Sequence, residues 1–327
     1  EFRMRVVLCL CIAAYVAAVP ASPYASVNNM IEEINARNVW VAGHNGIYSN
    51  PNNVQHLLGV PLDKVNFIPE DFPKATIDAN SAVPSSFDPR QKWKGCIGPI
   101  LDQAECGSCW AFGAAETASD RKCISAAENG LNATFLQLAP LDLVECGGEG
   151  GCEGGMPYEA MEWIKDEGLV TEKCLPYLKS EGGPIPTCSD EPCLNFVDTP
   201  SCKRRCSDSS SYESDKHKLA KVYSVDASQL KAELSTNGPV EVAFTVYEDF
   251  LHYKSGVYKH TSGSALGGHA VKMIGYGTEN GQDYWLVQNS WTTSWGDGGY
   301  FKIAPGECGE MTQPTEPRAT HTQTDRQ

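Results

Sequence analysis

The segment Gln103-Ala-Glu-Cys-Gly-Ser-Cys-Trp-Ala-Phe-Gly113 holds the residue types best suited to covalent chemistry. A glycine-containing turn leads into Cys109, and the Ala-rich stretch from Trp110 to Ser125 then predicts a helix. The N-terminus of a helix presents unpaired N–H groups and a partial positive charge, which stabilise a thiolate. With a histidine beside it, such a thiol is an activated nucleophile. We therefore expect Cys109 to be a nucleophile.

The histidine partner is harder to choose, because an arbitrary histidine is more often structural than catalytic. Of the seven histidines, only His269 lies in a glycine-bracketed apolar stretch downstream of Cys109. The other six lie near the N-terminus, in a polar tail, or beside charged or aromatic residues: His44, His56, His217, His252, His260 and His321.

The motif Cys106-Gly-Ser-Cys109-Trp110 matches the local signature of papain-like proteases. From Ile31 to about Gly309 the chain resembles this family, and most specifically its cathepsin B group. The further matching motifs are Ser86-Phe-Asp-Pro-Arg90, Ser119-Asp-Arg121, Asp142-Leu143, Cys152-Glu-Gly-Gly155, Gly238-Pro-Val-Glu241, Tyr253-Lys-Ser-Gly-Val-Tyr258, Gly267-Gly-His269 and Asn289-Ser-Trp291.

The resemblance implies a catalytic role for four of these residues. Cys109 would attack the scissile carbonyl, and His269 would deprotonate it and later protonate the leaving amine. Asn289 would orient the imidazole, shielded by Trp291. Gln103 would donate its side-chain amide to the oxyanion, a contact whose loss costs about 3–4 kcal/mol of barrier in such enzymes.

The resemblance also implies substrate contacts. Gly154, Gly155 and Gly268 would let the substrate backbone approach the cleft closely, although the first two could equally form a plain turn. Gln313 stands where the group has a glutamate in the pocket for the residue two before the scissile bond. A neutral amide cannot pair with arginine as a carboxylate does.

The stretch Cys188-Ser-Asp-Glu-Pro-Cys193 departs from the cathepsin B pattern. That group carries paired histidines here, which hold a substrate's C-terminal carboxylate, whereas this chain has none and places Asp190 and Glu191 instead. We therefore expect mainly endopeptidase activity. The tail beyond Gly309 is polar and lacks the group's apolar strand.

Fourteen cysteines argue for disulfides and an oxidising environment. Spacing alone does not select the pairs. The resemblance implies Cys96–Cys123, Cys106–Cys152, Cys146–Cys202, Cys174–Cys206 and Cys188–Cys193, with Cys308 free. The alternative for Cys188, Cys193, Cys202 and Cys206 is a zinc cluster, which the irregular spacing disfavours.

The N-terminus is consistent with this environment. The apolar run from Val6 to Val19 is too short to span a bilayer, and small residues follow it, so residues 4–21 read as a secretory signal peptide. We expect a lysosomal or extracellular protein without a membrane anchor. Asn132-Ala-Thr134 is a glycosylation sequon. The net charge of −15 disfavours nucleic acid as a partner.

The elements that must position these residues fall into three parts. Residues 22–82 contain too few apolar residues to build a core of their own. They include one predicted amphipathic helix, Val27 to Arg37. By resemblance they form an inhibitory pro-region that lies through the cleft in reverse and is removed near residues 82–84. Residues 83–327 would form the mature domain.

Within the mature domain, helices at 110–125 and 156–166 precede a loop-like region at 168–216. Strands then follow at 240–246, 271–274, 284–287 and 300–303, where apolar residues alternate or cluster. The expected fold is α+β and papain-like, with a helical lobe at about 96–220, a β-barrel-like lobe at about 221–305 and the cleft between them.

The expected partners are peptide or protein substrates, the chain's own pro-region and cystatin-type inhibitors, with no cofactor or metal. The rival function is that of a catalytically silent homologue acting as a binding protein.

Overall fold

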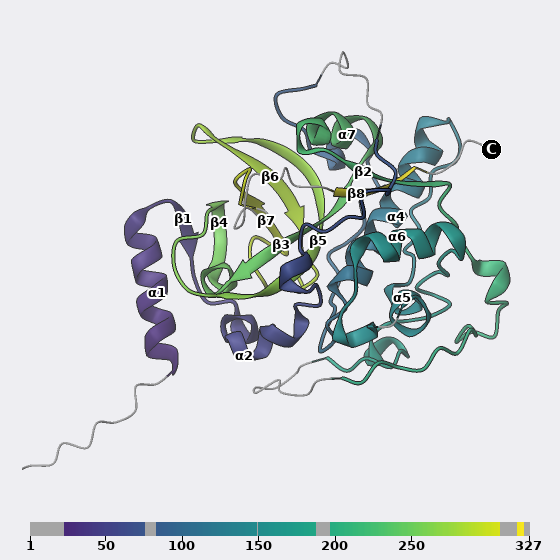
Figure 1. Cartoon of the computed structure of the whole chain (residues 1–327), viewed down its shortest axis with the longest axis horizontal. Coiled ribbons are helices and arrows are strands. Elements are labelled where there is room, and N and C mark those ends of the chain that lie inside the picture. Colours follow the sequence, from purple (N-terminus) through teal and green to yellow (C-terminus); the bar gives the residue numbers. More distant parts are fainter. Residues whose placement is uncertain (1–22, 76–82, 149, 188–196, 308–318, 324–327) are drawn as a thin grey trace, which may run out of the picture.

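The computed structural model describes residues 23–75, 83–148, 150–187, 197–307 and 319–323. It has the two expected lobes, a helical one and a β one, and the N-terminal segment (23–75) runs along both (Figure 1). The seven α-helices of the described residues are α1 (Pro23–Arg37), α2 (Pro51–Val54), α3 (Pro89–Lys92), α4 (Cys109–Glu128), α5 (Pro140–Cys146), α6 (Pro157–Asp166) and α7 (Leu230–Asn237). The expected helices at 27–37, 110–125 and 156–166 correspond to α1, α4 and α6.

Helix α4 forms the centre of the helical lobe. Its small side chains let it run through the interior, and Ala111, Ala114, Ala115 and Ala118 are fully buried. It packs against α5 and α6 on its own lobe and against β5 of the other lobe. Because α4 begins at Cys109, this packing fixes the expected nucleophile at the boundary between the lobes.

The β lobe is built on one sheet with the strand order β1-β4-β7-β6-β5-β3-β8-β2. The strands are β1 (Trp40–Ala42), β2 (Lys221–Val225), β3 (Val240–Tyr247), β4 (Tyr253–Tyr258), β5 (Ala265–Glu279), β6 (Gln282–Gln288), β7 (Tyr300–Ile303) and β8 (Ala319–Gln323). Among the described strands the sheet stays open, with β1 and β2 at its edges, so the expected barrel-like lobe is not a closed barrel. Strand β8 forms although its sequence is polar, because a ladder needs only backbone groups.

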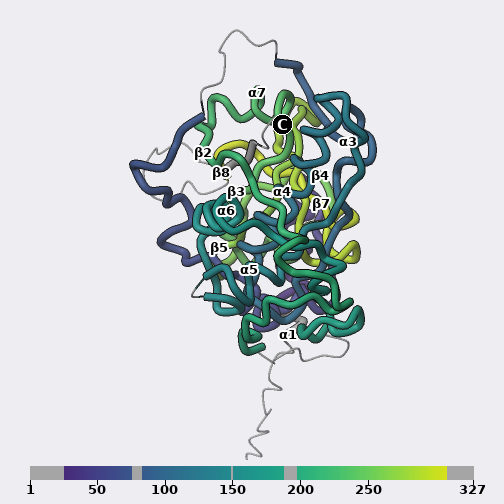
Figure 2. The backbone as a smooth tube through the Cα atoms, turned by 90° about the vertical axis from the view of Figure 1, so that its right-hand side faces the viewer, coloured from purple at the N-terminus to yellow at the C-terminus, as the bar shows by residue number. Residues whose placement is uncertain are grey.

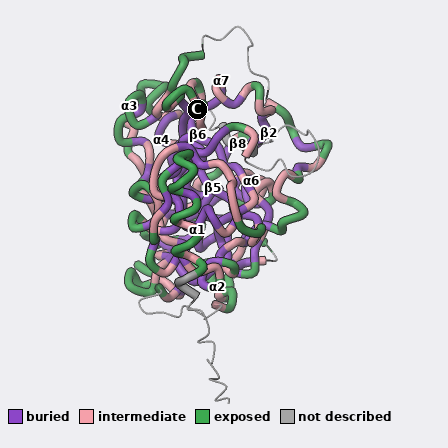
Figure 3. The backbone as a smooth tube through the Cα atoms, turned by 90° about the vertical axis from the view of Figure 1, so that its left-hand side faces the viewer, coloured by how far each residue is buried: buried purple, intermediate pink, exposed green. Residues whose placement is uncertain are grey.

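The N-terminal segment packs against both lobes, as expected for a segment with too few apolar residues to form a core of its own. Ile34, Trp40 and Leu57 belong to the core of the β lobe, whereas Ile68 and Phe72 belong to that of the helical lobe. Helix α1 itself is mostly exposed (Figure 3). From α1 the segment follows one side of the molecule toward β2 (Figure 2), where the Ala75 N–H donates to the Ser224 carbonyl at 2.7 Å.

Buried ion pairs join α4 to the β lobe. Lys272 Nζ on β5 lies 2.7 Å from Asp120 Oδ2 and 3.6 Å from Glu116 Oε2. Arg121 Nη2 lies 2.7 Å from Glu233 Oε1 on α7. All five side chains are at most 3% exposed, so the lobes are held by charges that cannot be separated without a large desolvation penalty.

Four of the five expected disulfides are present: Cys96–Cys123, Cys106–Cys152, Cys146–Cys202 and Cys174–Cys206. Since Cys202 and Cys206 are both oxidised, neither is available as a zinc thiolate. Cys188, Cys193 and Cys308 lie outside the described residues. No described helix has the length and apolar character needed to cross a membrane.

Candidate active site

Cys109 stands at the first position of α4, as the sequence predicted. Ser108 caps the helix without a side-chain hydrogen bond, and its carbonyl accepts the Phe112 N–H at 3.0 Å. The Cys109 thiol is fully buried and is the free cysteine of the described residues. Its position at the helix end gives it the amide environment that favours a thiolate once it is exposed.

His269 and Asn289 come together from neighbouring strands. His269 lies on β5 and Asn289 follows the end of β6; the distance between His269 Nε2 and Asn289 Oδ1 is 2.8 Å. The Ser290 N–H also donates to Asn289 Oδ1 at 2.8 Å, which identifies that atom as the amide oxygen. Nε2 of the neutral ring must therefore carry the proton, and Nδ1 is left as the basic nitrogen.

The surroundings of the imidazole fit this role. His269 Nδ1 is buried and has no hydrogen-bond partner among the described residues. The ring centroid of His269 lies 4.7 Å from that of Trp291, which is itself fully buried. Trp291 thus shields the bond between His269 and Asn289 from water, as the resemblance implied.

Gln103 is held with its amide N–H group directed into the cleft. Its Oε1 accepts from Ser290 Oγ at 2.7 Å and from Trp291 Nε1 at 3.2 Å. With the oxygen fixed, Nε2 points the other way and donates to the Leu57 carbonyl at 2.9 Å and the Cys106 carbonyl at 3.0 Å. The Leu57 carbonyl is therefore bound by the amide expected to hold a substrate's oxyanion.

Burial favours the neutral form of both Cys109 and His269. Burial raises the pKa of the Cys109 thiol to about 11, an effect that the backbone N–H groups of Ala270, Gly59 and Trp110 oppose. Burial lowers the pKa of His269 to about 4. Because Gly59 belongs to the N-terminal segment, that segment supplies one of the N–H groups that partly offset the effect of burial on the pKa of the thiol.

The predicted substrate-binding glycines contact the same segment. The Gly155 N–H donates to the Gly59 carbonyl at 2.9 Å, and the Val60 N–H donates to the Gly268 carbonyl at 3.1 Å. Gly154 has φ +124°, and a Cβ there would lie 2.3 Å from the Gly59 oxygen. These glycines therefore permit an extended chain to approach closely, whatever turn they also form.

Of the two remaining predicted site residues, Gln313 and Asn132, the structure describes only Asn132. Gln313 lies outside the described residues. Asn132 is exposed and lies in the loop between α4 and α5.

Sequence reasoning missed two supporting residues, Tyr177 and Ser290. The Tyr177 hydroxyl donates to the Gln103 carbonyl at 2.9 Å and lies 2.6 Å from Ser108 Oγ. Ser290 holds the Gln103 amide and could have been found inside the Asn289-Ser-Trp motif. Tyr177 lies in the loop-like region, where no sequence signal marked it.

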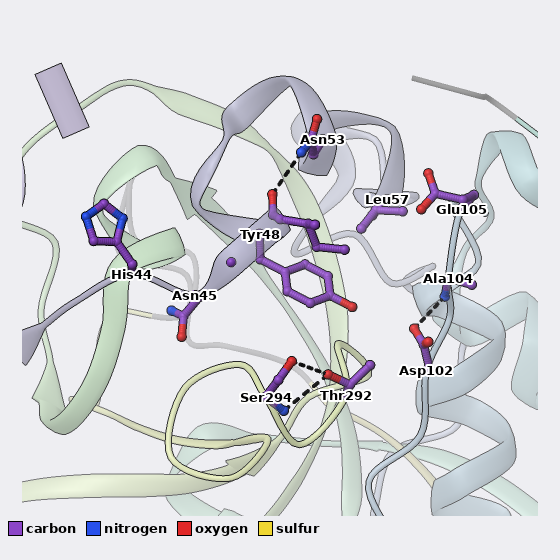
Figure 4. A pocket seen from close by; sticks show the side chains of 12 residues that line it. His44, Asn45, Tyr48, Asn53, Leu57, Asp102, Ala104, Glu105, Thr292 and Ser294 are labelled. Carbon is purple, nitrogen blue, oxygen red and sulfur yellow. Dashed lines mark hydrogen bonds between the residues drawn. The ribbon is translucent and has the colours of Figure 1, made fainter. Parts of the chain in front are cut away.

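A cavity of about 310 Å³ is lined by Asp102 and Ala104, the two neighbours of Gln103 in the sequence, and by residues of the N-terminal segment. Tyr48 and Leu57 of the N-terminal segment line one wall, and Asp102, Glu105 and Thr292 line the other (Figure 4).

Comparison with known proteins agrees with this geometry. The papain family cysteine protease profile matches residues 83–318. A cathepsin B of Dictyostelium discoideum is 52% identical over 235 residues, covering 69% of this chain and 72% of that protein. Cathepsin B-like cysteine proteinase 5 of Caenorhabditis elegans is 40% identical over 316 residues, covering 88% and 89%. The structure of procathepsin B S9 from Trypanosoma congolense has a TM-score of 0.75 at 31% identity, covering 91% of this chain and 98% of that chain. The chain therefore belongs to the papain family of cysteine proteases, and its sequence is cathepsin B-like.

Proposed function

We propose that the chain is the proenzyme of a cysteine endopeptidase that cleaves peptide bonds through a thioester intermediate. The observation that carries this proposal is the orientation of His269. Its Nε2–H donates to Asn289 Oδ1, so Nδ1 is the basic nitrogen. The next residue along the chain, Ala270, donates its backbone N–H to the Cys109 sulfur. His269 Nδ1 can take the thiol proton.

The proposed reaction has two halves. The Cys109 sulfur attacks the scissile carbonyl while its proton passes to His269 Nδ1. Gln103 Nε2 and the Cys109 N–H stabilise the oxyanion, and the leaving amine departs with the proton from His269. Water then attacks the thioester, giving its proton to His269, and the thiol is restored when the acid product leaves.

The N-terminal segment is proposed to inhibit this reaction directly. The Leu57 carbonyl accepts from Gln103, the proposed oxyanion donor. The Gly59 carbonyl then accepts from the Gly155 N–H, and the Val60 N–H donates to the Gly268 carbonyl. The chain therefore runs from Gln103 toward Gly155, which supports the expectation that it lies opposite to a substrate. In that orientation no peptide bond of the segment is presented for attack.

Endopeptidase specificity rests on the stretch from Cys188 to Cys193. It offers no histidine to a C-terminal carboxylate, and Asp190 and Glu191 would repel one. Gln313 in place of glutamate would favour apolar side chains over arginine in the second pocket. We further propose passage through the secretory pathway to a lysosomal or extracellular site, glycosylation at Asn132, and cystatin-type inhibitors as partners.

An affinity label tests the proposed function. The acid-processed protein is treated with an epoxide or vinyl-sulfone reagent, and modification of Cys109 is read by mass spectrometry. Labelling that Cys109→Ala abolishes supports the proposal; a folded, processed protein without labelling supports a silent binding protein instead.

Two reporter substrates test the specificity. A lost charge-assisted contact is worth about 1.5–3 kcal/mol, so kcat/KM for Phe-Arg should exceed that for Arg-Arg by roughly ten- to hundredfold. Equal rates would contradict the pocket argument. Efficient release of dipeptides from a free C-terminus would contradict the endopeptidase argument.

A further inference from the structure

Glu105 lies two residues after the oxyanion donor Gln103 and forms an ion pair with the N-terminal segment. Its Oε2 lies 3.1 Å from His56 Nε2, and the two side chains are 9% and 14% exposed. The His56 backbone lies against the turn before Cys109, because a Cβ on Gly107 would be 2.8 Å from the His56 carbonyl oxygen. His56 therefore holds an imidazole against Glu105 at the edge of the catalytic turn.

The position of His56 indicates which half of a substrate would lie beside Glu105. The next residue, Leu57, places its carbonyl at Gln103, and the segment then proceeds to Gly155 and Gly268. If those two glycines bind the acyl half of a substrate, as the proposed function requires, His56 lies on the opposite side of the oxyanion site. That side receives the residues after the scissile bond.

Apart from His56, no described basic side chain pairs with the acidic groups on the wall around Glu105. Asp102 and Glu105 both line the cavity and project toward the N-terminal segment (Figure 4). The pKa of Asp102 is raised by burial and, in addition, by Glu105, so the two carboxyl groups sense each other. Among the described lysines and arginines, none pairs with either carboxylate. Thr292 and Ser294, also on this wall, contribute only hydroxyl groups.

We infer that Glu105 is a specificity-determining residue that binds a cationic side chain, lysine or arginine, within two residues after the scissile bond. The inference rests on the proposed function. When the N-terminal segment leaves, Glu105 loses its imidazole partner and becomes accessible beside a second carboxyl group, that of Asp102. A substrate cation restores the pairing, and an acidic substrate side chain meets repulsion from both groups.

Matched peptides test this inference on the acid-processed protein. Internally quenched peptides share Phe-Arg before the scissile bond and differ only at the first or the second residue after it, which is Lys, Gln or Glu. At low salt, kcat/KM should be about three- to tenfold higher for Lys than for Gln at one of these positions. In Glu105→Gln this ratio should fall to near one. Glu153→Gln removes the same charge beside Gly154, from an exposed position on the acyl side, and should keep the ratio.

The outcomes separate this inference from the proposed function. Equal kcat/KM for Lys and Gln at both positions, or an unchanged ratio in Glu105→Gln, overturns the role of Glu105 while peptide cleavage stands. Failure of the folded, processed protein to cleave any of the peptides overturns both. If Glu105→Gln does not mature, the unmodified protein decides: a Lys preference that shrinks at high salt supports the inference, and one that does not shrink overturns it.

Discussion

Gln103 donates its side-chain amide to the backbone carbonyl of Leu57 at 2.9 Å, so the oxyanion donor is occupied by the chain's own N-terminal segment. Gln103, His269 and Asn289 therefore have their hydrogen-bond partners while the segment is in place. The segment restricts access, because the Gly59 N–H lies against the Cys109 thiol and the Leu57 carbonyl occupies the amide of Gln103. We therefore expect activation to require removal of the segment rather than rearrangement of these residues.

Replacing Gly59 should weaken the block. A Cβ at this position would lie 1.8 Å from the Gly107 carbonyl oxygen, so Gly59→Ala must displace the segment or the catalytic turn. We expect the unprocessed variant to activate faster and to react with a Cys109-directed label at a pH where the parent is silent. Leu62→Ala, at a side chain 48% exposed in the same segment, is the control and should behave like the parent. Equal labelling of Gly59→Ala and parent would show that the close approach does not matter.

The catalytic residues should differ in the size of their effects. Cys109→Ala should abolish turnover while the proenzyme still folds, since the change removes only one small sulfur atom from the interior. His269→Ala should be nearly as severe because the two residues act as a unit. Asn289→Ala should be milder, because Asn289 only orients the ring. Steady-state kcat for the three processed variants tests this ranking, and equal losses for Asn289→Ala and Cys109→Ala would refute it.

The buried imidazole predicts a specific pH dependence. The pKa of His269 falls from 6.5 to about 4 on burial, so the folded proenzyme binds fewer protons than the unfolded chain in this range. The contribution of this group to stability is complete above pH 6.5 and is lost as the pH falls toward 4. Buried carboxyl groups such as Glu116, whose pKa burial raises to about 8, act in the opposite direction, so only a difference between variants isolates His269.

Two inactive proenzymes make that comparison. Relative to Cys109→Ala, the double variant Cys109→Ala/His269→Gln should gain unfolding free energy by up to about 1.4 kcal/mol per pH unit between pH 6.5 and 4. Denaturant unfolding at several pH values measures the difference. A difference that stays constant with pH would show that His269 titrates normally in the proenzyme.

The buried lysine between the lobes should matter more than a surface lysine. Lys272→Met leaves Asp120 and Glu116 without their cation, and breaking such a pair costs about 3–5 kcal/mol of unfolding free energy. The loss should shrink in acid, where both carboxyl groups can take up protons. Lys231→Met, which removes an exposed pair with Asp283 at 3.4 Å, is the control and should cost under about 1 kcal/mol. Similar costs for the two variants would contradict the assignment.

Processing should cut between two anchored stretches. Ala75 is hydrogen-bonded to Ser224, and the Tyr276 hydroxyl donates to the Pro84 carbonyl at 3.0 Å, while Phe87 pairs with Tyr276. N-terminal sequencing of the acid-matured enzyme should therefore give a first residue near 82–84. A start before residue 70 or after residue 95 would mean that an anchored stretch is cut instead.

The sequence predicted much of this fold because its strongest signals are local. The Ala-rich run after Cys109 and the alternation from Val240 to Val246 each depend on neighbouring residues, and both elements formed where expected. Strand β1 escaped notice because three residues carry almost no periodic signal, and its pairing with β4 joins positions more than 200 residues apart.

The candidate site was likewise only partly predictable from the sequence. Cys109, His269, Asn289 and Gln103 were named through the family resemblance, and the structure brings His269 to Asn289 and places Gln103 against Ser290. The role of Glu105 could not be read from the sequence, since it depends on His56 arriving from 49 positions away. Pairings of this kind are properties of the folded chain.

The N-terminal segment places apolar side chains in the cores of both lobes, and this has a consequence for the lifetime of the processed enzyme. When the segment leaves, Trp40 and Phe72 withdraw from the interior, the edge of β4 loses its partner strand, and the remaining chain has fewer contacts to stabilise it. A processed molecule that unfolds would have to refold without these contacts. The time for which the processed enzyme stays active would then be set by its rate of unfolding rather than by the equilibrium between folded and unfolded chains. Processing would therefore both release the activity and limit how long it lasts.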